Sequence, residues 1–188
     1  MRIKWFSLIR ITGLLLVLLY HFFQTIFPGG FFGVDVFFTF SGFLITALLI
    51  EEFSKNHEID LVGFFRRRFY RIVPPVVLMV LVTMPFTFLV RQDYVAGIGG
   101  QIAGVLGFMT NFYELLTGGS YESQFIPHLF VHNWSLAVEV HYYILWGLAV
   151  WFLSKQAKSN GQLKGMVFLL SAAAFLISFF SMFIGSFL

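Results

Sequence analysis

The sequence has no cysteine, little charge and few prolines, and each shortage excludes a class of protein. Without cysteine, the chain has no disulfide, no thiolate zinc site and no thiol nucleophile. Five prolines and 17 glycines in 188 residues are too few for a collagen-like or low-complexity chain. Charged residues make up 11% of the chain, against roughly 25% in a typical soluble domain. Polar surface is therefore too scarce to coat a water-soluble globule.

Apolar side chains are what the sequence has instead, at 59% of the chain, with 27 phenylalanines among them. A membrane-spanning helix needs about 20 mainly apolar residues. We therefore predict an all-α fold, a polytopic transmembrane helical bundle that forms a single membrane domain over residues 1–188. Six segments meet the length requirement: 6–27, 31–50, 72–90, 95–116, 133–153 and 165–187.

The distribution of lysine and arginine favours a cytoplasmic N-terminus in the plasma membrane. Strict alternation of six spans places most basic residues in the cytoplasm, but it leaves three lysines after the fifth span outside: Lys155, Lys158 and Lys164. Either one segment does not cross fully, or this loop is an exception. The glycine-rich segment 95–116 is the candidate for incomplete crossing. Its glycines equally fit a close-packing face of small residues, which is the interpretation we favour.

Arg10 and His21 are ionisable residues inside the first apolar segment, where a charge costs at least a few kcal/mol. They are eleven positions apart, so they lie within about 20° of one helical stripe. A neutral imidazole at this place can accept a proton. In the alternative interpretation, Arg10 extends to the inner surface and His21 belongs to an outer aromatic belt.

Two acidic residues also lie inside predicted apolar segments. The short connection 28–30 makes the first two helices antiparallel neighbours, so Asp35 is expected at the same membrane end as His21. A carboxylate favoured by the helix dipole is an equal alternative for Asp35. Glu139, in the fifth segment, has no lysine or arginine near it in sequence, and a buried structural carboxyl is its alternative. The helical stripe that contains Glu139 also has Ser135, Tyr142 and Trp146.

Further polar residues flank the apolar segments. His128 and His132 have a spacing that can chelate a metal, but no third ligand is evident, so we predict no metal site. Residues 61–71 form a predicted interfacial helix with a basic face, suited either to lipid headgroups or to a polyanionic cofactor. Because this basic cluster adjoins an apolar segment, we expect no nucleic-acid partner. Walker A, G-x-G-x-x-G, G-x-S-x-G and H-E-x-x-H motifs are absent.

Four motifs, in this order, resemble the membrane-bound acyltransferase family 3, which includes peptidoglycan and lipopolysaccharide O-acetyltransferases. They are Arg10 with His21 eleven positions later, residues 33–38 with 41–45, residues 67–74, and residues 134–143. The resemblance extends through nearly the whole chain. It matches the N-terminal half of the family's membrane domain, without the esterase-like domain that many members append. The sequence departs from the family at Val140, where a second acidic residue is common.

The resemblance implies transfer of an acyl group, usually acetyl, from cytoplasmic acyl-CoA to a hydroxyl of an envelope glycan such as peptidoglycan. His21 would be the general base or transient acyl acceptor, and Asp35 and Glu139 would complete the catalytic set by shaping the polar interior. Arg10 would support His21 or the acyl carbonyl. Donor and substrate contacts would come from Arg10, Arg67, Arg68, Arg71, Ser41, Trp134, Ser135 and Tyr142.

The implied partners are acyl-CoA as a donor substrate, a glycan acceptor, the lipid bilayer, and a C-terminal half or an esterase-like domain. No permanently bound cofactor is expected. Two other functions remain open from the residues alone. One is a transporter or channel subunit whose polar stripes line a path, and the other is an inactive truncated product.

Overall fold

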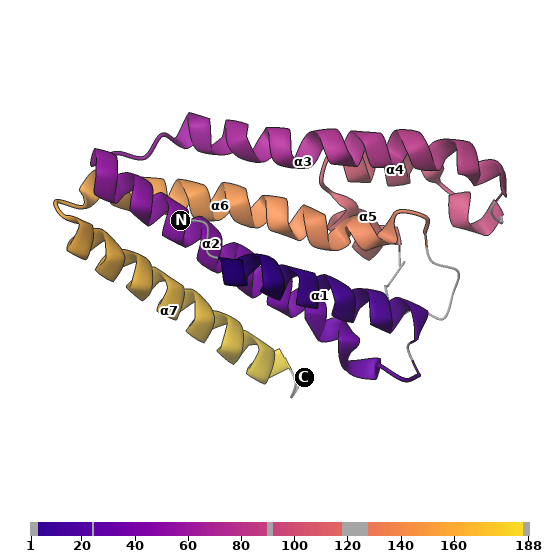
Figure 1. Cartoon of the computed structure of the whole chain (residues 1–188), viewed down its shortest axis with the longest axis horizontal. Coiled ribbons are helices and arrows are strands. Elements are labelled where there is room, and N and C mark those ends of the chain that lie inside the picture. Colours follow the sequence, from indigo (N-terminus) through magenta and orange to yellow (C-terminus); the bar gives the residue numbers. More distant parts are fainter. Residues whose placement is uncertain (1–3, 24, 90–91, 118–127, 186–188) are drawn as a thin grey trace. The chain divides into compact units, whose positions relative to one another are not determined.

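The computed structural model describes residues 4–23, 25–89, 92–117 and 128–185, with side chains for all of these except 4–7, 10, 92 and 93. Within these ranges the chain is helical and has no strand, which confirms the all-α prediction (Figure 1). The α-helices are α1 (Lys4–Phe22), α2 (Gly33–Asn56), α3 (Leu61–Thr83), α4 (Ile98–Leu106), α5 (Thr110–Thr117), α6 (Trp134–Gln156) and α7 (Asn160–Gly185). Short 3-10 helices join them: η1 (Pro28–Phe32), η2 (Met84–Leu89), η3 (Gln92–Val95) and η4 (Val131–Asn133).

Four helical stretches of the described chain are long and apolar enough to cross a bilayer: Pro28–Asn56, Leu61–Leu89, Val131–Gln156 and Asn160–Gly185. A shorter apolar helix covers Ile11–Phe22. These stretches confirm a multi-pass membrane protein.

The basic segment 61–71 and the apolar segment after it form one helix, α3, and not the separate interfacial helix that we predicted. Helix α3 runs through Pro74 and Pro75 without ending. Proline is tolerated inside helices of membrane proteins when neighbouring groups compensate for the lost hydrogen bonds. Buried residues lie on both sides of the two prolines: Gly63, Phe64, Val76 and Val80.

The single span predicted over 95–116 is not present, because the chain turns after Gly107. Helices α4 and α5 have 9 and 8 residues, and each is too short to cross a bilayer. The amide of Phe108 donates to Val105 O at 3.1 Å and that of Met109 to Gly104 O at 2.7 Å, the Schellman pattern that ends helices. Phe108 takes the left-handed conformation of this motif, with φ of 53°.

The glycines of this region also pack closely, as we expected. A Cβ atom on Gly100 would lie 2.8 Å from Cε2 of Tyr113 on α5. Gly104 faces the same tyrosine, with Cβ of Tyr113 at 3.5 Å from the position its own Cβ would take. The two interpretations of segment 95–116 therefore hold together: the segment fails to cross as one helix, and its glycines let the two short helices approach each other.

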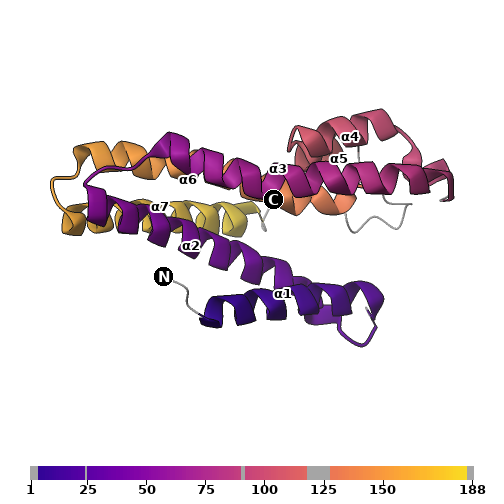
Figure 2. The same cartoon turned by 45° about the horizontal axis from the view of Figure 1, so that its top comes forward.

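The chain divides into two compact units. Unit 1 comprises Met1–Gly42 and Val62–Ile144, and unit 2 comprises Phe43–Leu61 and Leu145–Leu188. In unit 1 the second half of α3 packs against α4 and the segment that leads into α6, as the two views of the cartoon show (Figure 2). The buried cluster at this contact consists of Val76, Val80, Val105 and Phe130.

Helices α1 and α2 meet in unit 1 at glycines. A Cβ atom on Gly33 would lie 2.5 Å from the carbonyl oxygen of Gly13, and one on Gly30 would lie 2.4 Å from that of Leu16. Backbone atoms cannot give way as a flexible side chain can, so only glycine fits at these two positions. This close approach places the end of α1 that carries His21 beside the connection into α2.

Unit 2 shows the relative direction of α2 and α6. Trp146 Nε1 donates to Thr46 Oγ1 at 2.8 Å, and nearer the ends of the helices Lys155 Nζ donates to Glu58 Oε1 at 2.8 Å. Positions later in α2 therefore pair with positions later in α6, so the two helices run parallel. The buried hydrophobic side chains that α2, α6 and α7 contribute to this unit are Ile45, Leu49, Phe53, Val150, Leu163 and Val167, and Ile59 in the turn after α2 is buried with them.

Candidate active site

A carboxylate lies between α2 and α6 in unit 1, bonded to two hydroxyl groups. Glu139 Oε1 accepts hydrogen bonds from Ser41 Oγ and from the hydroxyl of Tyr143. The two hydroxyl oxygens are themselves 2.7 Å apart. Ser41 and Tyr143 are buried, whereas Glu139 is half-buried. The apolar surroundings of a membrane helix make an unbonded carboxylate costly, and these two hydroxyls satisfy it.

Arg68 completes this carboxylate cluster, defined as Ser41, Arg68, Glu139 and Tyr143. Its guanidinium carbon lies 5.6 Å from the ring centroid of Tyr143 and 5.5 Å from that of Phe64. Both distances are in the range of cation–π attraction, and Arg68 also interacts electrostatically with Glu139. Arg68 Nε is buried and has no hydrogen-bond partner among the described residues. A buried donor without a partner calls for an explanation, and a bound ligand oxygen would supply one.

The structure separates the arginines of α3 into two groups. Arg68 is half-buried and turned toward Tyr143, whereas Arg66, Arg67 and Arg71 are exposed. The three exposed guanidinium groups lie within about two helical turns of one another. Guanidinium groups of this kind suit phosphates of lipid headgroups or of a polyanionic cofactor, and which of these they bind stays a prediction.

His21 and His132 form a second cluster in unit 1, which we call the histidine pair. Their ring centroids are 4.9 Å apart and the rings are nearly perpendicular, at 74°. His21 Nδ1 lies 2.8 Å from the carbonyl oxygen of Val17. A carbonyl only accepts, so Nδ1 must carry the proton, and the lone pair of the neutral ring is on Nε2. Tyr20 lies edge-on to His21 at 5.6 Å, while the side chain of Arg10 lies outside the described residues.

Asp35 belongs to neither cluster. It is exposed in the first turn of α2, and the described contacts include no hydrogen bond or ion pair between Asp35 and His21. The described contacts therefore do not join His21, Asp35 and Glu139 in one cluster, and a catalytic role for Asp35 stays a prediction. The position of Asp35 agrees with the alternative, a carboxylate favoured by the N-terminal end of a helix dipole.

Tyr143, and not Tyr142, contacts Glu139. Tyr142 belongs to the helical stripe predicted from the sequence, and its side chain covers Gly42, where a Cβ atom would lie 3.3 Å from the tyrosine hydroxyl. A role of Tyr142 in binding stays a prediction. Tyr143 is four positions after Glu139, and side chains with this spacing are neighbours on a helix. The spacing is therefore a signal by which Tyr143 could have been found in the sequence.

Trp134 and Ser135, at the start of α6, make packing and capping contacts. The ring of Trp134 lies 6.3 Å from that of Phe38 on α2. Ser135 Oγ donates to the carbonyl oxygen of His132 at 3.3 Å. These contacts hold the first turn of α6 against α2 and against the histidine pair, and a direct role of Trp134 or Ser135 in binding stays a prediction.

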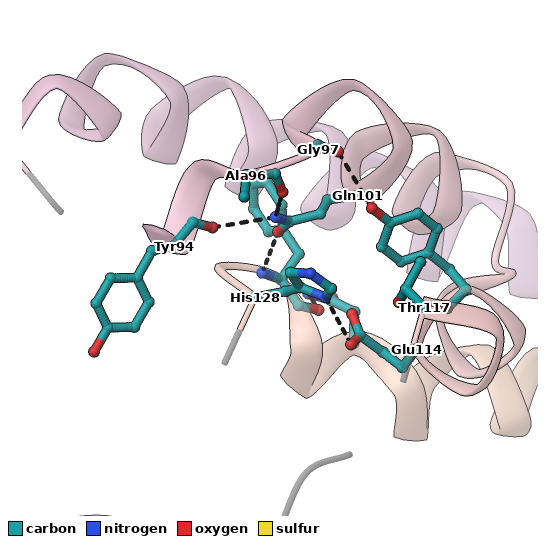
Figure 3. A network of polar contacts seen from close by, with 10 residues as sticks. Tyr94, Ala96, Gly97, Gln101, Glu114, Thr117 and His128 are labelled. Atoms are coloured by element: carbon teal, nitrogen blue, oxygen red, sulfur yellow. Dashed lines mark hydrogen bonds and ion pairs between the residues drawn. The ribbon is translucent and has the colours of Figure 1, made fainter. Parts of the chain in front are cut away.

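Gln101 is a buried polar residue that the sequence analysis missed (Figure 3). Its side chain is 1% exposed. Nε2 donates to the carbonyl oxygens of Tyr94 at 3.1 Å and Ala96 at 2.7 Å, and Oε1 accepts from the amide of Phe130 at 3.3 Å. One side chain on α4 thus anchors both the turn before α4 and the segment that leads into α6. No periodic pattern in the sequence indicates such contacts between distant segments.

His128 and His132 do not act as a pair. His128 Nδ1 lies 2.8 Å from Oε2 of Glu114 on α5, which is 6% exposed (Figure 3). His132 contacts His21 instead. The described residues contain no group of three or more histidine, cysteine, aspartate and glutamate side chains placed to hold a metal ion.

Comparison with known proteins gives the family. The model of a family described as an acyltransferase domain, acyltransferase family 3, matches residues 3–188. The chain belongs to this family. It is 32% identical over 150 residues to O-acetyltransferase OatA of Staphylococcus aureus (strain NCTC 8325 / PS 47), covering 80% of this chain and 25% of that protein. It is 31% identical over 139 residues to peptidoglycan O-acetyltransferase OatA of Listeria monocytogenes serovar 1/2a (strain ATCC BAA-679 / EGD-e), covering 73% of this chain and 22% of that protein.

The chain spans about a quarter of the length of these relatives: the matched part is 25% of the Staphylococcus aureus protein and 22% of the Listeria monocytogenes protein. No solved structure matches it.

The two clusters of the chain are both linked to α6: His132 lies in η4, two positions before the helix begins, and Glu139 is seven positions after His132. Seven residues correspond to about two helical turns, or roughly 10 Å. The family member thus has an imidazole with a defined tautomer near one end of α6, and a carboxylate with an arginine deeper along it.

Proposed function

We propose that the protein transfers an acetyl group from acetyl-CoA to a hydroxyl group of a cell-envelope glycan such as peptidoglycan. The observation that carries this proposal is the His21 imidazole, whose Nδ1–H is bound to the carbonyl of Val17 so that Nε2 holds the lone pair. The names of the two relatives, an O-acetyltransferase and a peptidoglycan O-acetyltransferase, support the reaction and the acceptor. They favour an enzyme over the transporter or channel subunit that the residues alone left open.

His21 Nε2 performs one of two roles in this reaction. As a general base, it takes the proton of the acceptor hydroxyl while the hydroxyl oxygen attacks the acetyl carbonyl and the thiolate of CoA leaves. As an acyl acceptor, Nε2 attacks the thioester itself, and the acetyl group then passes from the ring to the hydroxyl oxygen. In both routes the proton of the acceptor hydroxyl ends on the CoA thiolate, so the ring returns to the neutral form with its proton on Nδ1. Labelled acetyl on the His21 peptide after rapid denaturation without acid would identify the second route.

The carboxylate cluster and the exposed arginines serve the donor in this proposal. Arg67 and Arg71, exposed on α3, bind the phosphate groups of CoA, for which guanidinium geometry is well suited. Arg68 has an unused Nε donor in a buried place, where it can bind an oxygen atom of the donor away from the reacting carbonyl. Glu139, with its two hydroxyl partners, keeps Arg68 oriented and electrically balanced.

We also propose that the N-terminus and the turns after α2 and α6 are cytoplasmic. The ion pair between Lys155 and Glu58 brings these two turns to the same end of unit 2. Because α4 and α5 are too short to cross, α3 is the one described helix that returns across the membrane between the parallel helices α2 and α6. The lysines at the start of α7 and the end of α6 then lie on the same side as Lys55. The conflict with the positive-inside rule that six alternating spans created is removed.

Membranes that contain the intact protein test this function directly. They are incubated with acetyl-CoA labelled in its acetyl group, and the envelope glycan is purified and treated with mild alkali, which releases O-acetyl groups. We expect alkali-labile label on the glycan that depends on the protein. Glycan without label, or passage of a solute that does not depend on acetyl-CoA, would contradict the proposal.

A further inference from the structure

Ring faces, and not a direct ion pair, hold the guanidinium of Arg68 in unit 1. Its guanidinium carbon lies over the ring of Tyr143 on α6, at 5.6 Å, and over that of Phe64 on α3, at 5.5 Å. The described contacts include no ion pair between Arg68 and Glu139. A cation–π contact uses the flat face of a guanidinium and leaves the N–H groups at its edge unbonded. The described residues therefore do not use the hydrogen-bonding edge of Arg68, and its Nε is buried without a partner.

Tyr143 is the residue that links Arg68 to the carboxylate of Glu139. Its ring face meets the guanidinium, and its hydroxyl donates to Glu139 Oε1. Ser41 Oγ bonds the same carboxylate oxygen and lies 2.7 Å from the tyrosine hydroxyl. These bonds fix the hydroxyl end of the ring, while the backbone of α6 fixes the other end. The ring therefore presents its face to Arg68 in a defined orientation.

Burial keeps both rings in place before any ligand binds. Phe64 is 2% exposed and Tyr143 is 7% exposed, whereas Arg68 is half-buried. An arginine that becomes ordered only when its ligand binds loses rotamer entropy at that moment, which weakens binding. Rings that order the guanidinium beforehand remove this cost.

Two other arginines of α3 provide a comparison within the same helix. Arg66 and Arg71 are exposed, and neither lies over a ring face among the described residues. Arg68 thus differs from both in being ordered by aromatic contacts, although all three have the same side chain.

We propose that Tyr143 is a positioning residue for Arg68: its ring orders the guanidinium, so that the unused N–H groups of Arg68 bind an oxygen atom of the acetyl donor. The inference rests on the proposed function, because it concerns the donor which that function names. Phe64 supports the same guanidinium from within α3, and Glu139 and Ser41 act through the hydroxyl of Tyr143.

The first test measures acetyl transfer by membranes that contain the intact protein, over a range of acetyl-CoA concentrations. Tyr143→Leu removes the ring face, so the KM for acetyl-CoA should rise about threefold or more. The kcat should fall less, because Arg68 binds the donor away from the reacting carbonyl. Tyr143→Phe keeps the ring face but not its hydroxyl, and its KM should lie between those of the parent and Tyr143→Leu. Tyr70→Leu, at an exposed tyrosine of α3, is the control and should keep the parent KM.

A double-mutant cycle with Arg68→Gln separates positioning from support of the fold. If Tyr143 acts through Arg68, Tyr143→Leu should lower kcat/KM in the parent but change it less than about twofold in the Arg68→Gln background. A residue that supports only the fold would lower kcat/KM by the same factor in both backgrounds. Equal factors would therefore overturn the inference.

A chemical measurement distinguishes failure of this inference from failure of the proposed function. Phenylglyoxal modifies accessible guanidinium groups, and mass spectrometry of peptides from α3 follows each arginine without any acetyl transfer. Tyr143→Leu should speed the modification of Arg68 about threefold or more and leave Arg66 and Arg71 at their parent rates. If parent membranes transfer no acetyl but Arg68 still reacts faster in Tyr143→Leu, the proposed function fails and the positioning of Arg68 is supported. An unchanged rate at Arg68 would overturn the inference.

Discussion

Lys155 Nζ and Glu58 Oε1 are 2.8 Å apart and join the end of α6 to the turn after α2. The bonded ammonium holds the pKa of the Glu58 carboxyl below its usual range, so the pair stays ionised as the pH falls until that lowered pKa is reached. Both side chains are exposed, so the pair contributes little to stability. The pair nevertheless shows that the turns after α2 and after α6 lie at the same end of unit 2.

Cysteine labelling can test this arrangement, because the chain has no cysteine of its own. We expect Asn56→Cys and Lys158→Cys to be protected from an impermeant maleimide in intact cells and to react after permeabilisation. Gly29→Cys, in η1 at the other end of α2, should react in intact cells. Reaction of Lys158→Cys from outside, with Asn56→Cys protected, would instead indicate six alternating spans.

Gly33→Ala should weaken the contact between α1 and α2. Its new Cβ atom would meet the carbonyl oxygen of Gly13 at 2.5 Å, where the helices must separate. Overpacking of this kind costs about 1–3 kcal/mol, so we expect a clear loss of thermal stability in detergent. Gly29→Ala is the matched control, since its Cβ atom meets only Phe32 Cδ2, at 3.9 Å. Equal unfolding temperatures for the two variants would show that α1 and α2 are not held by this contact.

Tyr143→Phe removes one hydroxyl partner of Glu139 and leaves the ring in place. The half-buried carboxylate then loses a hydrogen bond, which costs about 1–3 kcal/mol and should lower both the unfolding temperature and the transfer rate. Tyr70→Phe makes the same chemical change on an exposed residue of α3 and should match the parent. A Tyr143→Phe protein as stable and active as Tyr70→Phe would contradict a role for this cluster.

Gln101→Leu should destabilise unit 1 by about 2–6 kcal/mol, because the amide of Phe130 and the carbonyl group of Ala96 lose their buried partner, at a cost of about 1–3 kcal/mol for each group. The carbonyl group of Tyr94 also loses a bond but keeps the one from the amide of Leu129. Hydrogen exchange of the Phe130 amide and the unfolding temperature report this loss. Gln156→Leu, at the exposed end of α6, is the control. Normal protection of the Phe130 amide in Gln101→Leu would show that Gln101 does not anchor this segment.

Long apolar runs allowed the main helices to be predicted from sequence. The predicted segment 31–50 falls largely within α2 (Gly33–Asn56), and 133–153 nearly coincides with α6 (Trp134–Gln156). Segment 95–116 was wrong because its helix ends in a left-handed conformation at Phe108, a residue that carries no sequence signal for it. Only the packing of α5 on α4 makes this turn favourable.

Some candidate residues could be chosen from sequence because they belong to motifs. Ser41, Arg68 and Glu139 each belong to a different motif, and the structure brings them together. The contact between His21 and His132 joins segments that are distant in sequence, and neither hydrophobic periodicity nor residue spacing contains information about it. Tertiary packing alone places these two rings side by side.

The most direct test of the proposed acetyl transfer is the O-acetyl content of the envelope glycan in cells that produce the intact protein or its His21→Gln variant. Mild alkali releases the O-acetyl groups as acetate, which is then measured, and immunoblotting confirms equal amounts of protein. We expect His21→Gln to lower the O-acetyl content to that of cells without the protein, while His141→Gln keeps the parent value. Parent-level O-acetylation in His21→Gln cells would contradict the assignment of His21 as the base or acyl acceptor.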